Sequence, residues 1–234
     1  MPEAARPAAV LLDIEGTTSR IAFVRDVLFP FARARLPALL AERADDPEVA
    51  AELAEVARLA PGQDRLAALL GWMDQDAKVT PLKALQGLLW REGYESGVLR
   101  GDLYPDVAPR LRAWHAAGVR LGIYSSGSVA AQKLLLGHSV AGDLTKLLDG
   151  FFDTRVGPKR EAESYRRIAA EMALAPGSVL FLSDAEAELD AAAAAGLRTC
   201  QIVRPEDGTV ASERHPTAAD LPAAARRNDL PGGG

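Results

Sequence analysis

Residues 8–13, Ala-Ala-Val-Leu-Leu-Asp, form a short continuous apolar run that ends at a carboxylate. A run of this kind is typical of a strand that is buried on both faces, as in a parallel sheet. Similar runs occur at 119–124, 179–182 and 199–203. Stretches with helical spacing lie among them, at 105–117, 161–174 and 185–195. This alternation predicts an α/β fold class, with a Rossmann-like parallel sheet covered by helices.

Residues 20–100 have a different pattern. Their Ala-, Glu- and Leu-rich segments show helical spacing and almost no β-branched runs. Because they directly follow the first predicted strand, we expect a helical domain inserted into an α/β core that comprises residues 1–19 and 101–234. The Gly- and Pro-rich end of the chain, from about 228 to 234, is expected to be disordered.

The composition excludes several classes of protein. The chain has 234 residues, with 27 Lys and Arg against 32 Asp and Glu, and a net charge of −5. This acidic balance argues against a nucleic-acid partner, which requires a basic face. No segment approaches the ~18 apolar residues that span a bilayer, and the first residues lack a secretory pattern, so we expect a cytoplasmic protein with no membrane partner. We expect Cys200 to be an ordinary buried thiol, and His115, His138 and His215 to have structural or surface roles.

Polar residues directly follow the predicted strands. In an open parallel sheet, ligands bind beyond the carboxyl ends of the strands, near the point where the strand order reverses. That rule selects Asp13 with Glu15, Ser125 with Ser126, and Ser183 with Asp184. Acids that converge on one edge repel each other unless a cation is present, and oxygen ligands suit Mg²⁺. The pattern therefore predicts a magnesium site at this edge of the sheet.

These residue types fit the chemistry of phosphate esters. Asp13 and Glu15 project to the same side if the chain stays extended; one carboxylate can then attack phosphorus while the other protonates the departing oxygen and later deprotonates water. Serine hydroxyls and helix-start N–H groups can hold phosphate oxygens, and the ammonium of Lys159 can offset negative charge. Ordinary explanations stay open: turns or caps for the acids, N-capping by Ser126 or Ser128, and a solvated charge for the lysine.

The order of these residues resembles the four motifs of the haloacid dehalogenase (HAD) superfamily, and the helical insertion resembles its cap domain. From about residue 8 to residue 208, the chain is similar to one family of that superfamily, the enolase-phosphatases or acireductone synthases. The similarity is carried by Leu11-Leu-Asp-Ile-Glu-Gly-Thr-Thr, Ile21-Ala-Phe-Val-Arg-Asp-Val-Leu-Phe-Pro, Leu103-Tyr-Pro-Asp-Val, Ile123-Tyr-Ser-Ser-Gly-Ser-Val-Ala-Ala-Gln-Lys-Leu-Leu, Phe151-Phe-Asp-Thr and Phe181-Leu-Ser-Asp.

The resemblance implies a role for each site residue. Asp13 is the catalytic nucleophile and a magnesium ligand, and Glu15 is a magnesium-binding and acid/base residue. Lys159 is catalytic and binds the substrate, and Asp184 is the last metal ligand. The remaining implied positions are Ser125 and Ser126, which contact the substrate phosphate, and Glu188, an acidic residue near the metal.

The resemblance also implies the reaction. It is the conversion of 2,3-diketo-5-methylthiopentyl 1-phosphate to the acireductone 1,2-dihydroxy-3-keto-5-methylthiopentene and phosphate, in L-methionine salvage, by a monomer with one Mg²⁺ per chain. The alternative is a magnesium-dependent HAD phosphatase that acts on another small phosphate monoester. A phospho-accepting receiver domain, from a different class, would be much shorter and would lack the insertion.

Two features of the insertion bear on selectivity. Phe23, Phe29, Trp72 and Trp90 either form its core or, as the resemblance implies, shield the methylthio end of the substrate. We favour the core. Arg20, at the start of the insertion, stands where we expect a smaller residue in relatives.

Overall fold

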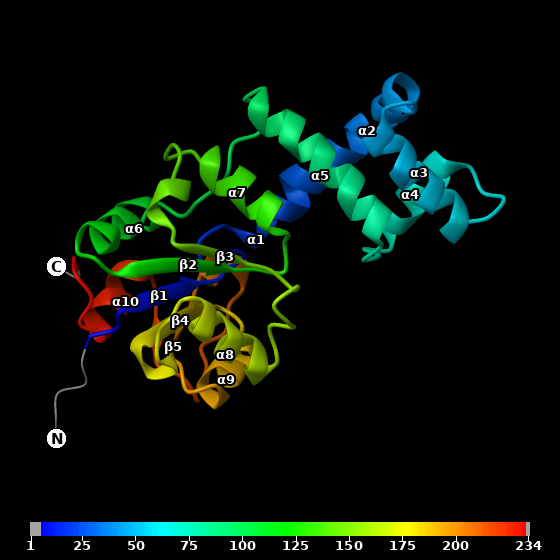
Figure 1. Ribbon diagram of the computed structural model, residues 1–234. Helices are drawn as coiled ribbons and strands as arrows, with labels where there is room; N and C mark the ends of the chain where they lie inside the picture. The colour runs from blue at the N-terminus through cyan, green and yellow to red at the C-terminus, as the bar shows by residue number, and fades with distance from the viewer. Residues whose placement is uncertain (1–5, 233–234) are drawn as a thin grey trace. The chain divides into compact units, whose positions relative to one another are not determined.

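The computed structural model describes residues 6–232, and the chain divides into two compact units. One unit contains the residues up to Ile21 and those from Gly101 onward, and the other is Ala22–Arg100. The division lies close to the two ends of the helical insertion that the sequence predicts. Figure 1 shows the first unit as a sheet with helices and the second as helices alone.

The first unit is built on a six-stranded parallel sheet with the strand order β3-β2-β1-β4-β5-β6. The strands are β1 (Ala9–Leu12), β2 (Arg120–Tyr124), β3 (Gly150–Phe152), β4 (Val179–Ser183), β5 (Arg198–Ile202) and β6 (Thr217–Ala218). In β1 every residue is buried, and Leu11 pairs with Gly122 on one side and Phe181 on the other. The predicted parallel α/β fold is therefore confirmed, with the 8–13 run at its centre.

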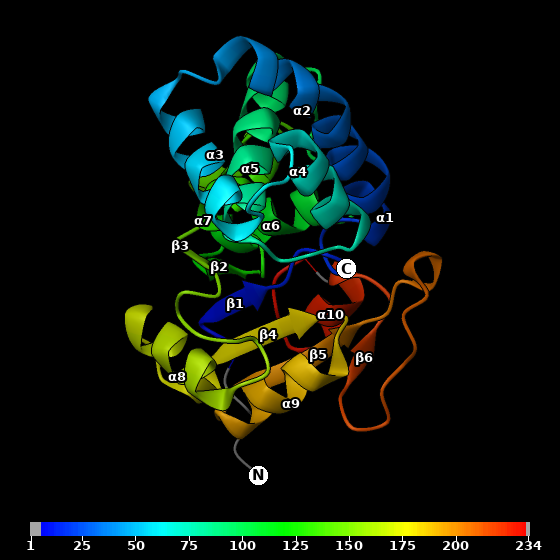
Figure 2. The same ribbon diagram turned by 90° about the vertical axis from the view of Figure 1, so that its right-hand side faces the viewer.

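Helices cover both faces of this sheet. They are α6 (Val107–Ala116), α7 (Val129–Gly137), α8 (Ala162–Glu171), α9 (Glu186–Ala194) and α10 (Leu221–Arg227), with short turns η2 (Thr145–Leu147), η3 (Pro176–Ser178) and η4 (Pro205–Asp207). Leu11 and Phe181 face α8 and α9, which lie together on one side of the sheet in Figures 1 and 2. The other face packs against α6 and α10, which contact each other. The sequence patterns missed β3, β6 and α10, because the two strands have only three and two residues and the helix has only about two turns.

The segment expected to be a disordered tail differs from that expectation over residues 228–232. Leu230 is only 5% exposed, and its N–H donates to the carbonyl of Ala225 in α10. The side chain of Asn228 donates to the carbonyl of Ala224 at 2.9 Å. These residues are therefore ordered for two reasons: the Leu230 side chain is buried, and the carbonyls at the end of α10 receive hydrogen bonds from residues 228 and 230. Residues 233–234 lie outside the described part of the chain.

The second unit has its own apolar core. Its helices are α1 (Ile21–Phe23, beginning at the boundary), the π-helical turn η1 (Val24–Leu28), α2 (Phe29–Arg43), α3 (Pro47–Leu59), α4 (Arg65–Asp74) and α5 (Thr80–Glu95). Asp46 and Asp64 begin α3 and α4, because their carboxylates accept N–H bonds from the first turn. Trp90 stacks on Phe29 with ring centroids 6.3 Å apart and packs with Trp72 against this core.

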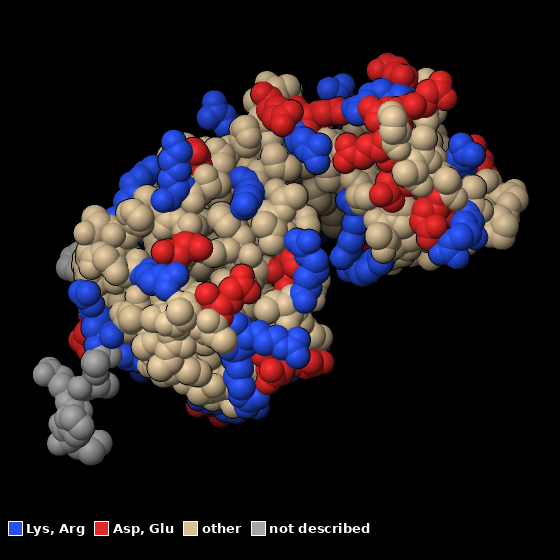
Figure 3. All heavy atoms as spheres, viewed as in Figure 1, with Lys and Arg blue, Asp and Glu red and all other residues tan. Residues whose placement is uncertain are grey.

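The surface carries both acidic and basic side chains, as expected from their similar numbers in the sequence. On the face drawn in Figure 3, acidic and basic side chains are interspersed over both units. Within residues 6–232, none of the helices is both long enough and apolar enough to cross a membrane.

The buried position of Cys200 predicts low reactivity. The residue is fully buried in β5, and burial raises the pKa of its thiol to about 11. Because the thiolate is the reactive form, we expect a disulfide reagent at about pH 8 to label the native protein at least ~100-fold more slowly than protein unfolded in guanidinium chloride. Absorbance of the released thiol measures both rates. Similar rates would contradict the burial of Cys200.

Candidate active site

The site residues meet at the carboxyl ends of neighbouring strands. Asp13 follows β1, Ser125 follows β2 and Asp184 follows β4, while Lys159 lies in the loop between β3 and α8. The chain builds β2 and β3 on one side of β1 and then crosses to β4 on the other side. The strand order therefore reverses next to β1, which is where open α/β sheets bind their ligands.

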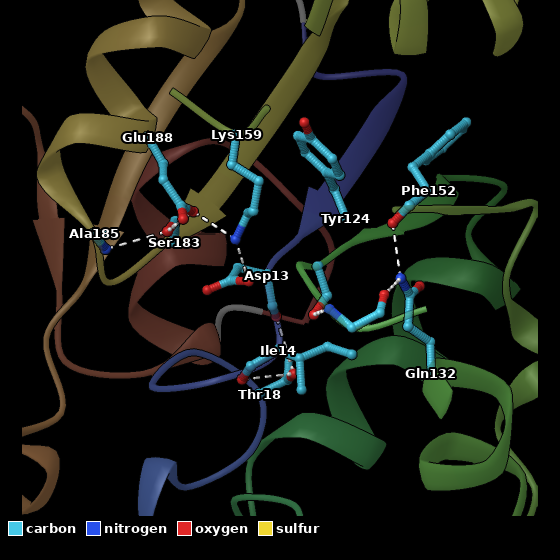
Figure 4. A network of polar contacts seen from close by, with 12 residues as sticks. Asp13, Ile14, Thr18, Tyr124, Gln132, Phe152, Lys159, Ser183, Ala185 and Glu188 are labelled. Carbon is cyan, nitrogen blue, oxygen red and sulfur yellow. Dashed lines mark hydrogen bonds and ion pairs between the residues drawn. The ribbon is translucent and has the colours of Figure 1, made fainter. Parts of the chain in front are cut away.

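Lys159 joins two acids inside the protein. Lys159 is only 8% exposed, and its Nζ lies 2.6 Å from Asp13 Oδ1 and 2.6 Å from Glu188 Oε2 (Figure 4). Burial alone would lower the pKa of this ammonium, but the two carboxylates raise it above its ordinary value. The hydroxyl of Tyr165 donates to the Lys159 carbonyl at 2.7 Å and fixes the loop. Lys159 is thus a paired internal charge and not a solvated one.

Glu188 belongs to this network. The buried hydroxyl of Ser183 donates to Glu188 Oε2 at 3.0 Å and accepts the N–H of Ala185 at 3.1 Å. Burial, and then the charge of Asp13, raise the pKa of Glu188. The resemblance had placed Glu188 only near the metal. The orienting contact of Ser183 was missed, although its position at the end of β4 was the available signal.

Asp184 packs against the turn that follows Asp13. Gly16 has a φ of +72°, and a Cβ at this position would lie 2.5 Å from Asp184 Oδ2. Residue 16 must therefore be glycine both for its backbone angle and for the close approach of the carboxylate. Burial, followed by the charges of Asp13 and Glu188, raises the pKa of Asp184 to about 7. Asp13 is thus close enough to Asp184 for its charge to raise the pKa of Asp184.

The turn after β1 changes the expected position of Glu15. The strand ends at Leu12, and the hydroxyl of Thr18 donates to the Asp13 carbonyl at 3.0 Å. The N–H groups of residues 17, 18 and 19 all donate to the carbonyl of Ile14. The chain is therefore not extended from Asp13 to Glu15, and Glu15 is exposed whereas Asp13 is buried. The role of Glu15 stays a prediction.

The serine loop, residues 125–128 between β2 and α7, is held in part by its own serines. The hydroxyl of Ser125, which is buried, accepts the N–H of Gly127 at 3.1 Å, whereas Ser126 is exposed. Ser128 caps α7 by accepting the N–H of Ala131 at 3.2 Å, as one of the ordinary explanations expected.

A carboxylate and an amide from outside the loop complete its support. Asp153, just after β3, accepts the N–H of Val129 at 3.1 Å. Gln132 donates from Nε2 to the carbonyls of Gly127 and Phe152, both at 2.8 Å (Figure 4). The sequence patterns gave no sign of these supports. The contact of Ser125 and Ser126 with the substrate phosphate stays a prediction.

The residues present fit a magnesium ion. Among residues 6–232, no three His, Cys, Asp or Glu side chains converge as a ready-made metal site. Mg²⁺, however, usually takes only one or two carboxylates and completes its shell with water and phosphate oxygens. Asp13 and Asp184 supply two hard oxygen donors, and Gly16 leaves room beside Asp184. These two acids would hold the ion.

The fold and this site define a haloacid dehalogenase-like hydrolase. A family model with the description "Hydrolase: haloacid dehalogenase-like hydrolase" matches residues 7–196. The Enolase-phosphatase E1 of Gluconacetobacter diazotrophicus is 62% identical, over 95% of each chain, and that of Acidiphilium cryptum is 60% identical, over 97% of each. The chain belongs to this enolase-phosphatase family, and is thus a phosphatase.

Solved structures share the fold of this chain. The UTR4 protein of Saccharomyces cerevisiae superposes with a TM-score of 0.80 at 34% identity, covering 92% of this chain and 98% of that one. CbbY of Rhodobacter sphaeroides superposes with a TM-score of 0.61 at 19% identity, covering 92% of this chain and 95% of that one. This second likeness concerns the fold alone.

The raised pKa of Asp184 predicts a pH effect on stability without metal. Its folded-state pKa of about 7 exceeds the ordinary value of 3.8, so the protonated group favours the folded state at low pH, and this contribution is lost as the pH rises through about 7. Between about pH 5.5 and pH 8 in chelator, we expect the unfolding free energy of the wild type to fall by about 1 kcal/mol more than that of Asp184→Asn, after allowance for solvent screening. Urea unfolding at both pH values measures the difference. Identical pH dependence in the two proteins would contradict the raised pKa.

Proposed function

We propose that this protein is a magnesium-dependent enolase-phosphatase that converts 2,3-diketo-5-methylthiopentyl 1-phosphate to the acireductone 1,2-dihydroxy-3-keto-5-methylthiopentene and phosphate. The observation that carries the phosphatase chemistry is the buried contact of Lys159 with Asp13 and Glu188 at the reversal point of the sheet. The similarity to the Enolase-phosphatase E1 proteins supports this particular substrate. The reaction belongs to L-methionine salvage.

Asp13 is the nucleophile of the phosphoryl-transfer step, which follows enolisation of the diketone. One carboxylate oxygen attacks phosphorus, the bond from phosphorus to the ester oxygen breaks, and its electron pair leaves with that oxygen, which Glu15 protonates. A water molecule then attacks the aspartyl phosphate at phosphorus and gives its proton to Glu15. The bond between phosphorus and the carboxylate oxygen breaks, which restores Asp13 and releases phosphate. Glu15, being exposed, can exchange its proton with solvent.

Lys159 and the serine loop prepare this reaction. The ammonium orients the Asp13 carboxylate through Oδ1 and offsets negative charge as the phosphate approaches. Ser125 and Ser126 bind the substrate phosphate, because transfer of a phosphoryl group depends mainly on placement and charge neutralisation. Glu188, held by Ser183, keeps the ammonium in position.

Asp13 and Asp184 are the proposed carboxylate ligands of one Mg²⁺ per chain, and Glu15 is proposed as a further ligand because the family resemblance implies it. When bound, the ion would supply positive charge beside the phosphate and polarise the diketone toward its enol. We further propose that the enzyme acts as a monomer in the cytoplasm on a small-molecule phosphate ester. The net charge of −5 supports a function without nucleic acid.

Replacing the nucleophile tests the phosphoryl step. Asp13→Asn keeps the size of the side chain but removes the attacking carboxylate, so we expect phosphate release to fall by at least ~10³-fold. Glu163→Gln, an exposed change on α8, is the matched control and should retain full activity. Wild-type protein in excess chelator should also be inactive until Mg²⁺ is restored. Full activity of Asp13→Asn, or of the wild type in chelator, would overturn this mechanism.

The choice of substrate is tested by two simultaneous signals. With the diketone phosphate, we expect ultraviolet absorbance of the enol to appear together with phosphate release, because enolisation and dephosphorylation occur in one protein. Sugar phosphates and phosphoglycolate serve as comparison esters and should react far more slowly. Hydrolysis of these esters without reaction of the diketone phosphate would favour a HAD phosphatase with another substrate.

A further inference from the structure

Gln201 is a buried amide that touches the turn carrying Asp184. It lies in β5, opposite Ser183 of β4, and is 2% exposed. Its Nε2 donates to the main-chain carbonyl of Asp184 at 2.8 Å and to that of Val210 at 3.0 Å. Its Oε1 accepts the N–H of Ser212 at 2.7 Å. Both ends of the amide therefore have partners, which link Asp184 to a distant segment.

That segment, residues 209–216, is here called the C-terminal strap, and it is also fastened to α9. The Ser212 hydroxyl donates to Glu186. His215 Nε2 lies 3.0 Å from Asp190 Oδ1, and its Nδ1 lies 2.9 Å from the Thr199 hydroxyl. The surface or structural role expected for His215 is thus a fastening role.

The strap holds the same helix that carries Glu188. Glu186 and Asp190 are one helical turn apart and lie on one side of α9, whereas Glu188, between them in sequence, projects from a different side. Glu188 is the residue that reaches Lys159. The strap therefore contacts one side of α9, and Lys159 contacts another side through Glu188.

The turn from β4 to α9 has no side-chain cap at Ala185, the residue that precedes the helix. The N–H of Ala185 donates to the Ser183 hydroxyl, and the N–H groups of Glu188 and Leu189 donate to the Ala185 carbonyl. Without Gln201, the Asp184 carbonyl would lose the 2.8 Å bond that fixes it from the neighbouring strand. A shift of the main chain at Asp184 would move its carboxylate with it.

We propose that Gln201 is a positioning residue for the metal side of the site, which holds the Asp184 carboxylate in the orientation that binds Mg²⁺ by anchoring its main chain to the C-terminal strap. This inference rests on the proposed function, since the magnesium site is part of it. All three hydrogen bonds of the amide go to Asp184 and the strap. The effect should therefore fall on metal affinity more than on the KM for the substrate at saturating Mg²⁺.

The test is direct binding of Mg²⁺, measured by isothermal titration calorimetry on the full chain without substrate. Gln201→Met keeps the length of the side chain but removes its hydrogen bonds, and we expect the Kd for Mg²⁺ to rise about tenfold, as is usual when support behind a metal ligand is lost. The matched control is Gln132→Met. Gln132 is also a buried amide, 1% exposed, that donates to two carbonyls, but these belong to the serine loop and β3. Its variant should keep the wild-type Kd within about twofold.

Gln201→Asn is the second variant. Its amide is one methylene too short to reach the Asp184 carbonyl, so the Kd of this variant for Mg²⁺ should also rise. This variant is the test of the inference if circular dichroism shows that Gln201→Met does not fold. A wild-type Kd in a folded Gln201 variant, or an equal loss in Gln132→Met, would overturn the inference. If the wild type itself binds no Mg²⁺, the proposed metal site fails, which is a distinguishable result.

Discussion

The buried ammonium of Lys159 is the group on which the rest of the site depends. Asp13 and Glu188 lie on either side of it, and Asp184 is close enough to share their electrostatic field. Removing one partner from a buried ion pair costs about 3–5 kcal/mol, because a charge is left without compensation. The lysine thus allows acids to gather at one edge of the sheet before a metal arrives. It also gives the nucleophile a fixed orientation.

The fold supplies the convergence that this ion network needs. β1 lies between β2 and β4, so three parallel strands deliver their following residues to one edge. The loop that carries Lys159 is held there by Tyr165 from α8, whose ring also packs edge-on against Tyr124 of β2. The site is therefore built from strand ends and buried side chains. Its geometry follows from the same packing that stabilises the core.

Much of this arrangement could be predicted from the sequence because apolar runs that end at polar residues are strong local signals. They identified β1 and the positions of Asp13, Ser125 and Asp184, and the motif order added Lys159. The supports of the site could not be found in this way. Gln132 and Gln201 act through hydrogen bonds to main-chain atoms of other segments, and no spacing rule reports such contacts. The strand-end rule selected Ser183, but not its contact with Glu188.

In two places the structure differs from the sequence-based prediction, and each difference has a physical cause. The turn after Leu12 separates the environments of Asp13 and Glu15, because three N–H groups converge on the carbonyl of Ile14 and end the extended path. Near the end of the chain, a single apolar residue, Leu230, is buried and orders a segment whose composition favours disorder.

The decisive measurement is to detect a phosphoryl group on Asp13 during turnover. Enzyme mixed with the diketone phosphate and Mg²⁺ is quenched within the first turnovers and treated with borohydride, which reduces an aspartyl phosphate to homoserine; tandem mass spectrometry then locates the change. Homoserine should appear at position 13 in the wild type and be absent from a sample quenched without substrate. Unmodified Asp13 in enzyme that is releasing phosphate, or modification at a different acid, would contradict the role of Asp13 as the nucleophile.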